Sequence, residues 1–150
     1  MKEKAILFNW ILVKELAIGT NPSTQNHLDI LKAQGINSIL CLCSNKEIKP
    51  PKEIYSEFNY RHIDLPDHRA KRIITLEELT NSISILSELM KKSPVFVHCL
   101  ASMERSPLVA MAWLITKQKL TYEQAFSYMI QVHKGTNPMP EQLEVLRSII

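Results

Sequence analysis

The sequence predicts an α/β fold in which a central, mainly parallel sheet of about five strands is flanked by helices and followed by a C-terminal helical cluster. Strand-like apolar runs alternate with helical patterns over the first two thirds of the chain, and only helical patterns follow. Such alternation is typical of a parallel sheet with helical crossovers. The chain of 150 residues can bury a sizeable core, so we expect residues 1–150 to form a single domain.

The first elements are two short strands and a helix. Apolar runs at 5–13 and 15–19 predict the strands, although the N-terminal run superficially resembles a secretion signal. That run is short, continues into charged residues and lacks a small-residue cleavage site, so we interpret it as a strand. Ser23 or Thr24 can cap the helix that follows, and Gly35 is expected to end it.

The middle of the chain predicts a strand, a short helix and a second strand. The apolar segment 36–44 is typical of a buried strand, and prolines at 50 and 51 then interrupt the chain. A short helix is expected near 52–58, directly after the prolines. The segment 60–65 predicts the next strand, and a polar loop follows it.

The last part of the chain holds one strand and several helices. Thr75 and Glu78 form a capping-box pattern, which predicts a helix that runs to about Lys92. The apolar segment 93–98 predicts the fifth strand. Thr121 with Gln124 repeats the capping-box pattern, and the C-terminal helices are expected at 106–117, 122–134 and 141–149.

Composition excludes several classes of protein. The net charge of +3 is small and its basic residues are dispersed, so no nucleic-acid partner is expected. No apolar run approaches the length of a membrane span, so no stable membrane insertion is expected. Three cysteines, Cys41, Cys43 and Cys99, are too few for a disulfide framework and lack zinc spacing. We therefore expect a cytoplasmic protein that needs no metal or cofactor.

The segment 95–107 reads VFVHCLASMERSP, an apolar strand followed by an abrupt polar turn. We expect the strand to end at His98, a tight loop to run from Cys99 to Arg105, and a helix to begin at Ser106. This segment is the 99–105 loop. Backbone N–H groups of such a loop and of the helix terminus bind anions and stabilise a thiolate. Arg105 can bind two oxygens of a tetrahedral anion, so the sequence predicts a nucleophilic Cys99 beside an anion site.

The run HCLASMERS resembles the His-Cys, five residues, Arg-Ser/Thr signature (the CX5R motif) of the cysteine-dependent protein tyrosine phosphatase superfamily. The short chain is similar to the dual-specificity branch, and so is the segment LAIGTNPSTQNHLDILKAQGINSILCL. The resemblance covers nearly the whole chain and implies a tyrosine-phosphatase-like fold. It also implies metal-independent hydrolysis of phosphate monoesters through a cysteinyl-phosphate intermediate.

The resemblance implies roles for individual residues. Cys99 is expected to be the nucleophile, Arg105 the phosphate clamp, Ser106 the stabiliser of the departing thiolate, and His98 the residue that orders the loop. The remaining residues of the phosphate-binding loop are Leu100, Ala101, Ser102, Met103 and Glu104. Such chemistry also needs a general acid. Asp64 and Asp67 are both candidates, and the interval to Cys99 favours Asp67.

Two loop residues depart from the common pattern, and a basic run, HRAKR at 68–72, follows the proposed acid. Ser102 stands where the family usually has Gly, and its Cβ atom is costly if the backbone there is left-handed. Glu104 places a carboxylate near the rim, where it would repel a highly anionic ligand. The basic run Arg69, Lys71 and Arg72 could form a substrate rim, although a solvated loop is the simpler reading.

The function expected from these residues is that of a dual-specificity phosphatase acting on phosphotyrosine and on phosphoserine or phosphothreonine in proteins. Alternative substrates are RNA 5′-phosphates, phosphorylated glycans and phosphoinositides. Two other functions stay open: a non-catalytic phosphate-binding module, and a sulfurtransferase with a similar cysteine loop. Cys41 and Cys43 are expected in the core, and a protective disulfide to Cys99 is the less favoured alternative. His27, His62 and His133 are expected to be structural or surface residues.

Overall fold

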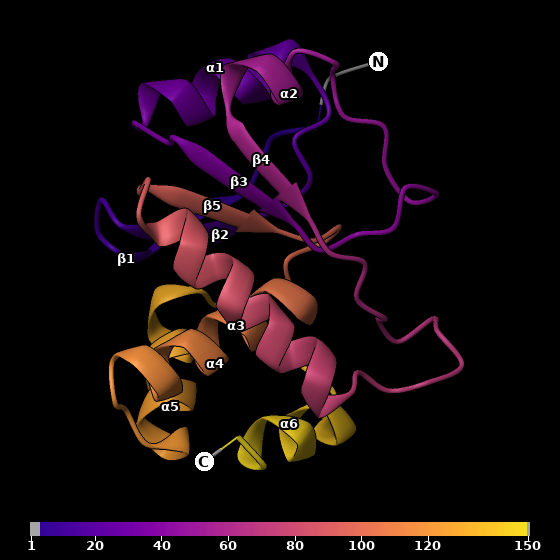
Figure 1. Cartoon of the computed structure of the whole chain (residues 1–150), viewed down its shortest axis with the longest axis vertical. Helices are drawn as coiled ribbons and strands as arrows, with labels where there is room; N and C mark the ends of the chain where they lie inside the picture. The colour runs from indigo at the N-terminus through magenta and orange to yellow at the C-terminus, as the bar shows by residue number, and fades with distance from the viewer. Residues whose placement is uncertain (1–3, 150) are drawn as a thin grey trace.

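A computed structural model describes residues 4–149 and shows a five-stranded sheet (Figure 1). The strands lie in the order β1-β2-β5-β3-β4. Only β1 is antiparallel to its neighbour, and the other pairs are parallel. The strand bounds are β1 Phe8–Leu12, β2 Leu16–Gly19, β3 Ser38–Cys41, β4 Asn59–His62 and β5 Val95–His98. The predicted α/β fold with a mainly parallel sheet is therefore confirmed.

Helices cover both faces of the sheet (Figure 1). One face packs against α1 and α2 through a core that includes Leu28, Ile39 and Phe96. The other face packs against the later helices through a larger core, because alternate strand residues such as Leu40 and Val97 point to that side. The helix bounds are α1 Gln25–Ala33, α2 Ile54–Glu57, α3 Leu76–Met90, α4 Arg105–Lys117, α5 Tyr122–Val132 and α6 Pro140–Arg147.

The expected helix caps are present. Thr24, one of the two candidates, accepts a hydrogen bond from the backbone N–H of His27 at 3.2 Å. Both predicted capping boxes form, at the starts of α3 and α5. Gly35 lies two residues beyond α1 with φ of +85°, a conformation that favours glycine.

Several predicted elements are too long. The strand expected at 36–44 ends at Cys41, because the Leu42 carbonyl accepts hydrogen bonds from Leu65 and Arg105. The helix expected at 122–134 ends at Val132. His133 has an extended conformation with φ of −146°, and its side chain turns away to contact other elements.

The carboxyl end of β5 leads directly into the 99–105 loop, and α4 follows it. Helix α4 begins at Arg105, one residue earlier than predicted, so Arg105 lies in its first turn. Its residues from Arg105 to Ile115 are all buried, which is typical of a helix enclosed by other elements. The 99–105 loop is therefore anchored to a helix in the interior. Among residues 4–149, no helix combines the length and the apolar character needed to cross a membrane.

Candidate active site

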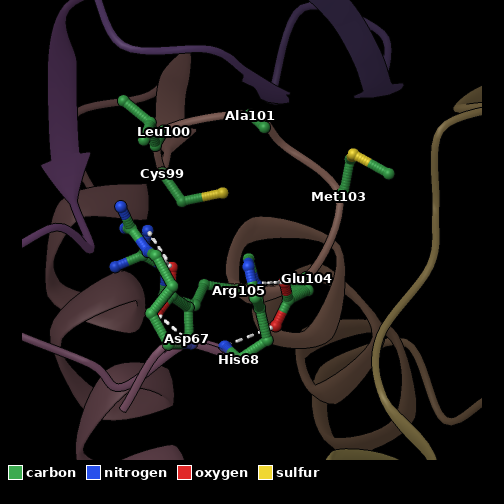
Figure 2. A pocket seen from close by; sticks show the side chains of 9 residues that line it. Asp67, His68, Cys99, Leu100, Ala101, Met103, Glu104 and Arg105 are labelled. Atoms are coloured by element: carbon green, nitrogen blue, oxygen red, sulfur yellow. Dashed lines mark hydrogen bonds and ion pairs between the residues drawn. The ribbon is translucent and has the colours of Figure 1, made fainter.

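A cavity of about 260 Å³ opens beside the 99–105 loop (Figure 2). In open α/β sheets, ligands bind beyond the carboxyl ends of the strands, and this cavity follows β5. It is lined by residues of two loops, which are Asp67, His68, Arg69, Cys99, Leu100, Ala101, Met103, Glu104 and Arg105. Residues far apart in the sequence, Asp67 and Cys99, thus face one pocket, as predicted for a nucleophile and an acid.

The 99–105 loop places the sulfur of Cys99 against a hydroxyl group. Cys99 is 2% exposed, and its Sγ lies 3.3 Å from Oγ of the fully buried Ser106. Ser102 has φ of +58°, so the conformation that usually favours glycine is occupied by a residue with a side chain. The Nδ1–H of His98 can donate to the Cys99 carbonyl at 3.3 Å, which links the strand end to the loop.

Arg105 is held by a bidentate ion pair with Glu47. Its Nη1 and Nη2 atoms donate to the two carboxylate oxygens at 3.0 and 2.9 Å, and Nη1 also contacts the carbonyls of Leu42 and Leu65. Burial raises the pKa of Glu47, but the hydrogen bond and charge of Arg105 outweigh it and hold that pKa below its usual range. The bidentate pair fixes the plane of the Arg105 guanidinium at the cavity that Cys99 also lines.

Asp67 is held at the mouth of the cavity by Arg69. Its carboxylate accepts hydrogen bonds from the backbone N–H of Arg69 at 3.0 Å and from Nε at 2.9 Å, and it lies 3.6 Å from Nη2 of Arg105. Burial raises the pKa of Asp67, but the hydrogen bonds from Arg69 and the charge of Arg105 outweigh this effect. The pKa of Asp67 is therefore held below its usual range. Asp64, the alternative candidate, is exposed and does not line the cavity.

Glu104 lies on the rim, as expected, but its carboxylate is paired. It accepts from the backbone N–H of His68 at 3.0 Å and from Nε2 of Gln142 at 3.1 Å, and it contacts Nδ1 of His68 (Figure 2). The side chain of Glu104 is 15% exposed. The expected repulsion of an anion is therefore reduced by these donors, which also tie the 99–105 loop to the segment that carries Asp67.

The residues of the basic run lie in different surroundings. Arg69 lines the cavity, where it pairs with Asp67 and with Glu47. Arg72 instead forms a bidentate pair with Glu78 at the start of α3, at 2.7 and 2.8 Å. Neither Arg72 nor Lys71 lines the cavity in the part of the chain that is described. Of the three suggested rim residues, only Arg69 is thus at the site.

The two other cysteines are buried, as expected, and all three cysteines are free thiols. Cys41 and Cys43 lie beside His98, with the three potential ligand atoms within 4.8 Å of one another. These residues could offer three ligands to a soft ion such as Zn²⁺, one fewer than a structural zinc site uses. Among the described residues that line the cavity, none of these three is present.

The sequence did not point to Glu47, Asn9, Gln142 or the role of His133. Nothing in the local pattern around Glu47 distinguishes it, although it follows β3, whose carboxyl end lies beside that of β5. His133 was expected to be structural or on the surface, and it is fully buried against Ser102. Such contacts join distant parts of the chain, so spacing along the sequence carries no signal for them.

The comparisons with known proteins agree with this geometry. Residues 16–149 match the sequence model of the family described as dual specificity phosphatase, catalytic domain. Dual specificity protein phosphatase 7 of Homo sapiens is 31% identical over 113 residues, covering 75% of this chain and 26% of that protein. Phosphatidylglycerophosphate phosphatase PTPMT2 of Arabidopsis thaliana is 24% identical over 118 residues, covering 77% and 51%.

The solved structures support the fold. Tk-PTP in its active form superposes with a TM-score of 0.80 at 22% identity, covering 95% of this chain and 97% of that one. The chain spans only about a quarter of the length of the human relative named above. The family match nevertheless extends over most of the chain, including β2 to β5 and all six helices among the described residues. The chain therefore belongs to the dual specificity phosphatase catalytic domain family.

Proposed function

We propose that residues 1–150 form one catalytic domain that hydrolyses phosphate monoesters through Cys99, with phosphorylated tyrosine, serine or threonine side chains of proteins as substrates. The observation that carries this proposal is the convergence of Cys99, Arg105 and Asp67 on one cavity. Cys99 lies against the hydroxyl of Ser106, and Arg105 is preorganised by Glu47. The three cysteines of the chain are free thiols, which fits a reducing cytoplasm, and we place the protein there.

In the first step, the Cys99 thiolate attacks phosphorus while the ester P–O bond breaks. Asp67 donates its proton to the departing oxygen, which would otherwise leave as a poor alkoxide or phenolate. Arg105 and the N–H groups of the 99–105 loop stabilise the charge on the phosphoryl oxygens. The products of this step are the free alcohol and a cysteinyl-phosphate.

In the second step, the Asp67 carboxylate accepts a proton from water as the water oxygen attacks phosphorus. The S–P bond breaks, and the sulfur leaves as a thiolate that accepts a hydrogen bond from Ser106. Inorganic phosphate is released, and both Cys99 and Asp67 return to their starting protonation states. No metal takes part in either step.

A phosphorylated lipid headgroup is the second candidate substrate. PTPMT2 is named as a phosphatidylglycerophosphate phosphatase, and PTPMT1 has been solved in complex with PI(5)P. The protein substrate is favoured because Arg69, the member of the basic run that lines the cavity, is already paired with the carboxylates of Asp67 and Glu47. A headgroup with several phosphates would find few unpaired cations here.

The test is hydrolysis of p-nitrophenyl phosphate in excess EDTA by the wild type and by Cys99→Ser. We expect activity to survive chelation and to be lost in the variant. A folded wild type that binds vanadate at Cys99 without turnover would instead establish a phosphate-binding module. Sulfur transfer from thiosulfate to cyanide would overturn the phosphatase proposal, and comparison of phosphopeptides with phosphoinositide vesicles would rank the two substrate classes.

A further inference from the structure

A chain of hydrogen bonds lies behind the 99–105 loop and ends at the proposed nucleophile. It begins at Asn9 in β1, whose Nδ2 lies 2.8 Å from Nδ1 of His133. An amide nitrogen can only donate, so Nδ1 accepts, and a neutral His133 then carries its hydrogen on Nε2. Asn9 therefore fixes which ring nitrogen of His133 is a donor.

His133 directs that donor at the loop. Nε2–H donates to the Ser102 carbonyl at 2.6 Å, and it also lies 3.3 Å from the Ser102 hydroxyl. Both His133 and Ser102 are fully buried, so water does not compete for these groups. The contact spans 31 residues and holds the one position of the loop that has a left-handed backbone.

The chain continues through two hydroxyl groups to sulfur. Ser102 Oγ lies 2.9 Å from Ser106 Oγ, which lies 3.3 Å from Sγ of Cys99. The single Nε2–H of His133 is shared between the carbonyl and the hydroxyl oxygen of Ser102, so the hydroxyl hydrogen of Ser102 is available to Ser106. The hydrogen of Ser106 is then directed to Cys99, where a thiolate can accept it.

We propose that His133, oriented by Asn9, is a positioning residue that acts through Ser102 to hold the Ser106 hydroxyl as a donor to Cys99. The proposal rests on the proposed function, because it assumes that Cys99 works as a thiolate. It also explains the side chain at position 102. Glycine would adopt the backbone conformation more easily, but it could not supply the hydroxyl that joins His133 to Ser106.

The test measures the pH dependence of Cys99 alkylation by iodoacetamide, which needs no substrate. In His133→Leu and in Ser102→Gly, we expect the midpoint of alkylation to move to higher pH and kcat to fall about tenfold with little change in KM. Ser102→Gly removes the hydroxyl without backbone strain, so it keeps the test valid if His133→Leu folds poorly. His133→Gln keeps a donor near the Nε2 position and should restore most of the wild-type profile.

A double-mutant cycle separates positioning from general support of the fold. If His133 acts through Ser106, then His133→Leu should add almost nothing in a Ser106→Ala background. Fully additive effects, or an unchanged alkylation profile in both His133→Leu and Ser102→Gly, would overturn the proposal.

The matched control is His27→Leu. His27 is also buried and bonded through both ring nitrogens, to the Ser23 N–H at 3.0 Å and the Lys4 carbonyl at 2.7 Å, but it lies in α1. The His27→Leu variant should have a lower melting temperature but an unchanged midpoint of Cys99 alkylation. An equal shift in this control would show that any lost histidine disturbs Cys99, which contradicts positioning. Loss of the proposed function would be seen separately, as turnover that persists in Cys99→Ser.

Discussion

The rear and the front of the 99–105 loop are held by different kinds of interaction. At the rear, Ser102, Ser106 and His133 are fully buried and joined by uncharged hydrogen bonds. At the front, the side chains of His68 and Arg69 are 59% and 49% exposed and pair with carboxylates. Buried hydrogen bonds are not weakened by salt, whereas exposed ion pairs are individually weak and screened.

This difference matches the tasks of the two sides. The proposed nucleophile and its hydroxyl partner must keep one geometry throughout the reaction, and a rigid, dry environment provides that. The proposed acid must give up and regain a proton, so it benefits from weaker contacts that can rearrange. Asp67 lies at the front and Cys99 at the rear of the same cavity.

The largest effect at the front is expected from Asp67→Asn. Without an acid, the leaving oxygen departs unprotonated, and we expect kcat to fall about 10²- to 10³-fold for an alkyl phosphate. The loss should be smaller for p-nitrophenyl phosphate, whose leaving group needs less help. Steady-state kinetics with both substrates measure this, and Asp64→Asn is the matched control. A greater loss in Asp64→Asn would show that the acid is misassigned.

The ion pair between Glu47 and Arg105 is charged, but it is largely buried, like the hydrogen bonds at the rear of the loop. Glu47→Gln removes the bidentate carboxylate partner of Arg105, which is 3% exposed, and leaves the longer contact to Asp67 at 3.6 Å. We expect a loss of about 2 kcal/mol in the free energy of unfolding, less than for a fully buried pair because Glu47 keeps 16% of its side-chain exposure. Urea unfolding at pH 7 measures this change.

The effect of Glu47→Gln can be checked with a control variant and through its pH dependence. Glu57→Gln removes a more exposed partner of Lys32 and should cost much less. The folded-state pKa of Glu47 is lowered, so the stability from its charge is present above the ordinary Glu pKa of about 4.3 and is lost as the pH falls through the folded value. The two proteins should therefore converge in stability at acid pH, and a constant difference down to pH 3 would contradict this origin.

How far the sequence predicts the molecule depends on the range of the interactions involved. Capping boxes at Thr75 and Thr121 act over three residues, and both were predicted correctly. The loop residues from Cys99 to Ser106 are equally local, so their placement after β5 followed from the motif. Asp67 could be chosen over Asp64 only through the family resemblance, and the cavity lining supports that choice.

Long-range contacts explain where the sequence was insufficient. The end of α5 was placed two residues too late because a helical pattern includes His133, whereas its bonds to Asn9 and Ser102 require it to leave the helix. The pairing of Arg105 with Glu47 joins residues 58 apart. Such choices are made by tertiary packing, and periodicity does not record them.

A smaller effect is expected from Arg69→Met, which removes the cation that lowers the pKa of Asp67. Because Asp67 must be protonated to act as the acid, a higher pKa extends activity to higher pH. The exposed pair is weak, so we expect the rate on the alkaline limb to rise only about two- to fivefold. A pH profile of kcat measures this. Lys71→Met, on the same loop, is the control, and an equal rise there would indicate a general charge effect.

The smallest effect is expected from His68→Ala, which removes the side-chain Nδ1 contact to the Glu104 carboxylate at the rim but keeps the backbone N–H donor. With one partner fewer, the Glu104 carboxylate repels an anionic substrate more strongly, so KM should rise about two- to threefold with kcat nearly unchanged. Because the group is exposed, about 0.5 M salt should remove the difference. Kinetics at low and high salt test this, with Ser102→Gly as the comparison from the rear of the loop. That variant should keep its defect at both salt concentrations, and equal salt sensitivity of the two would contradict the division between front and rear.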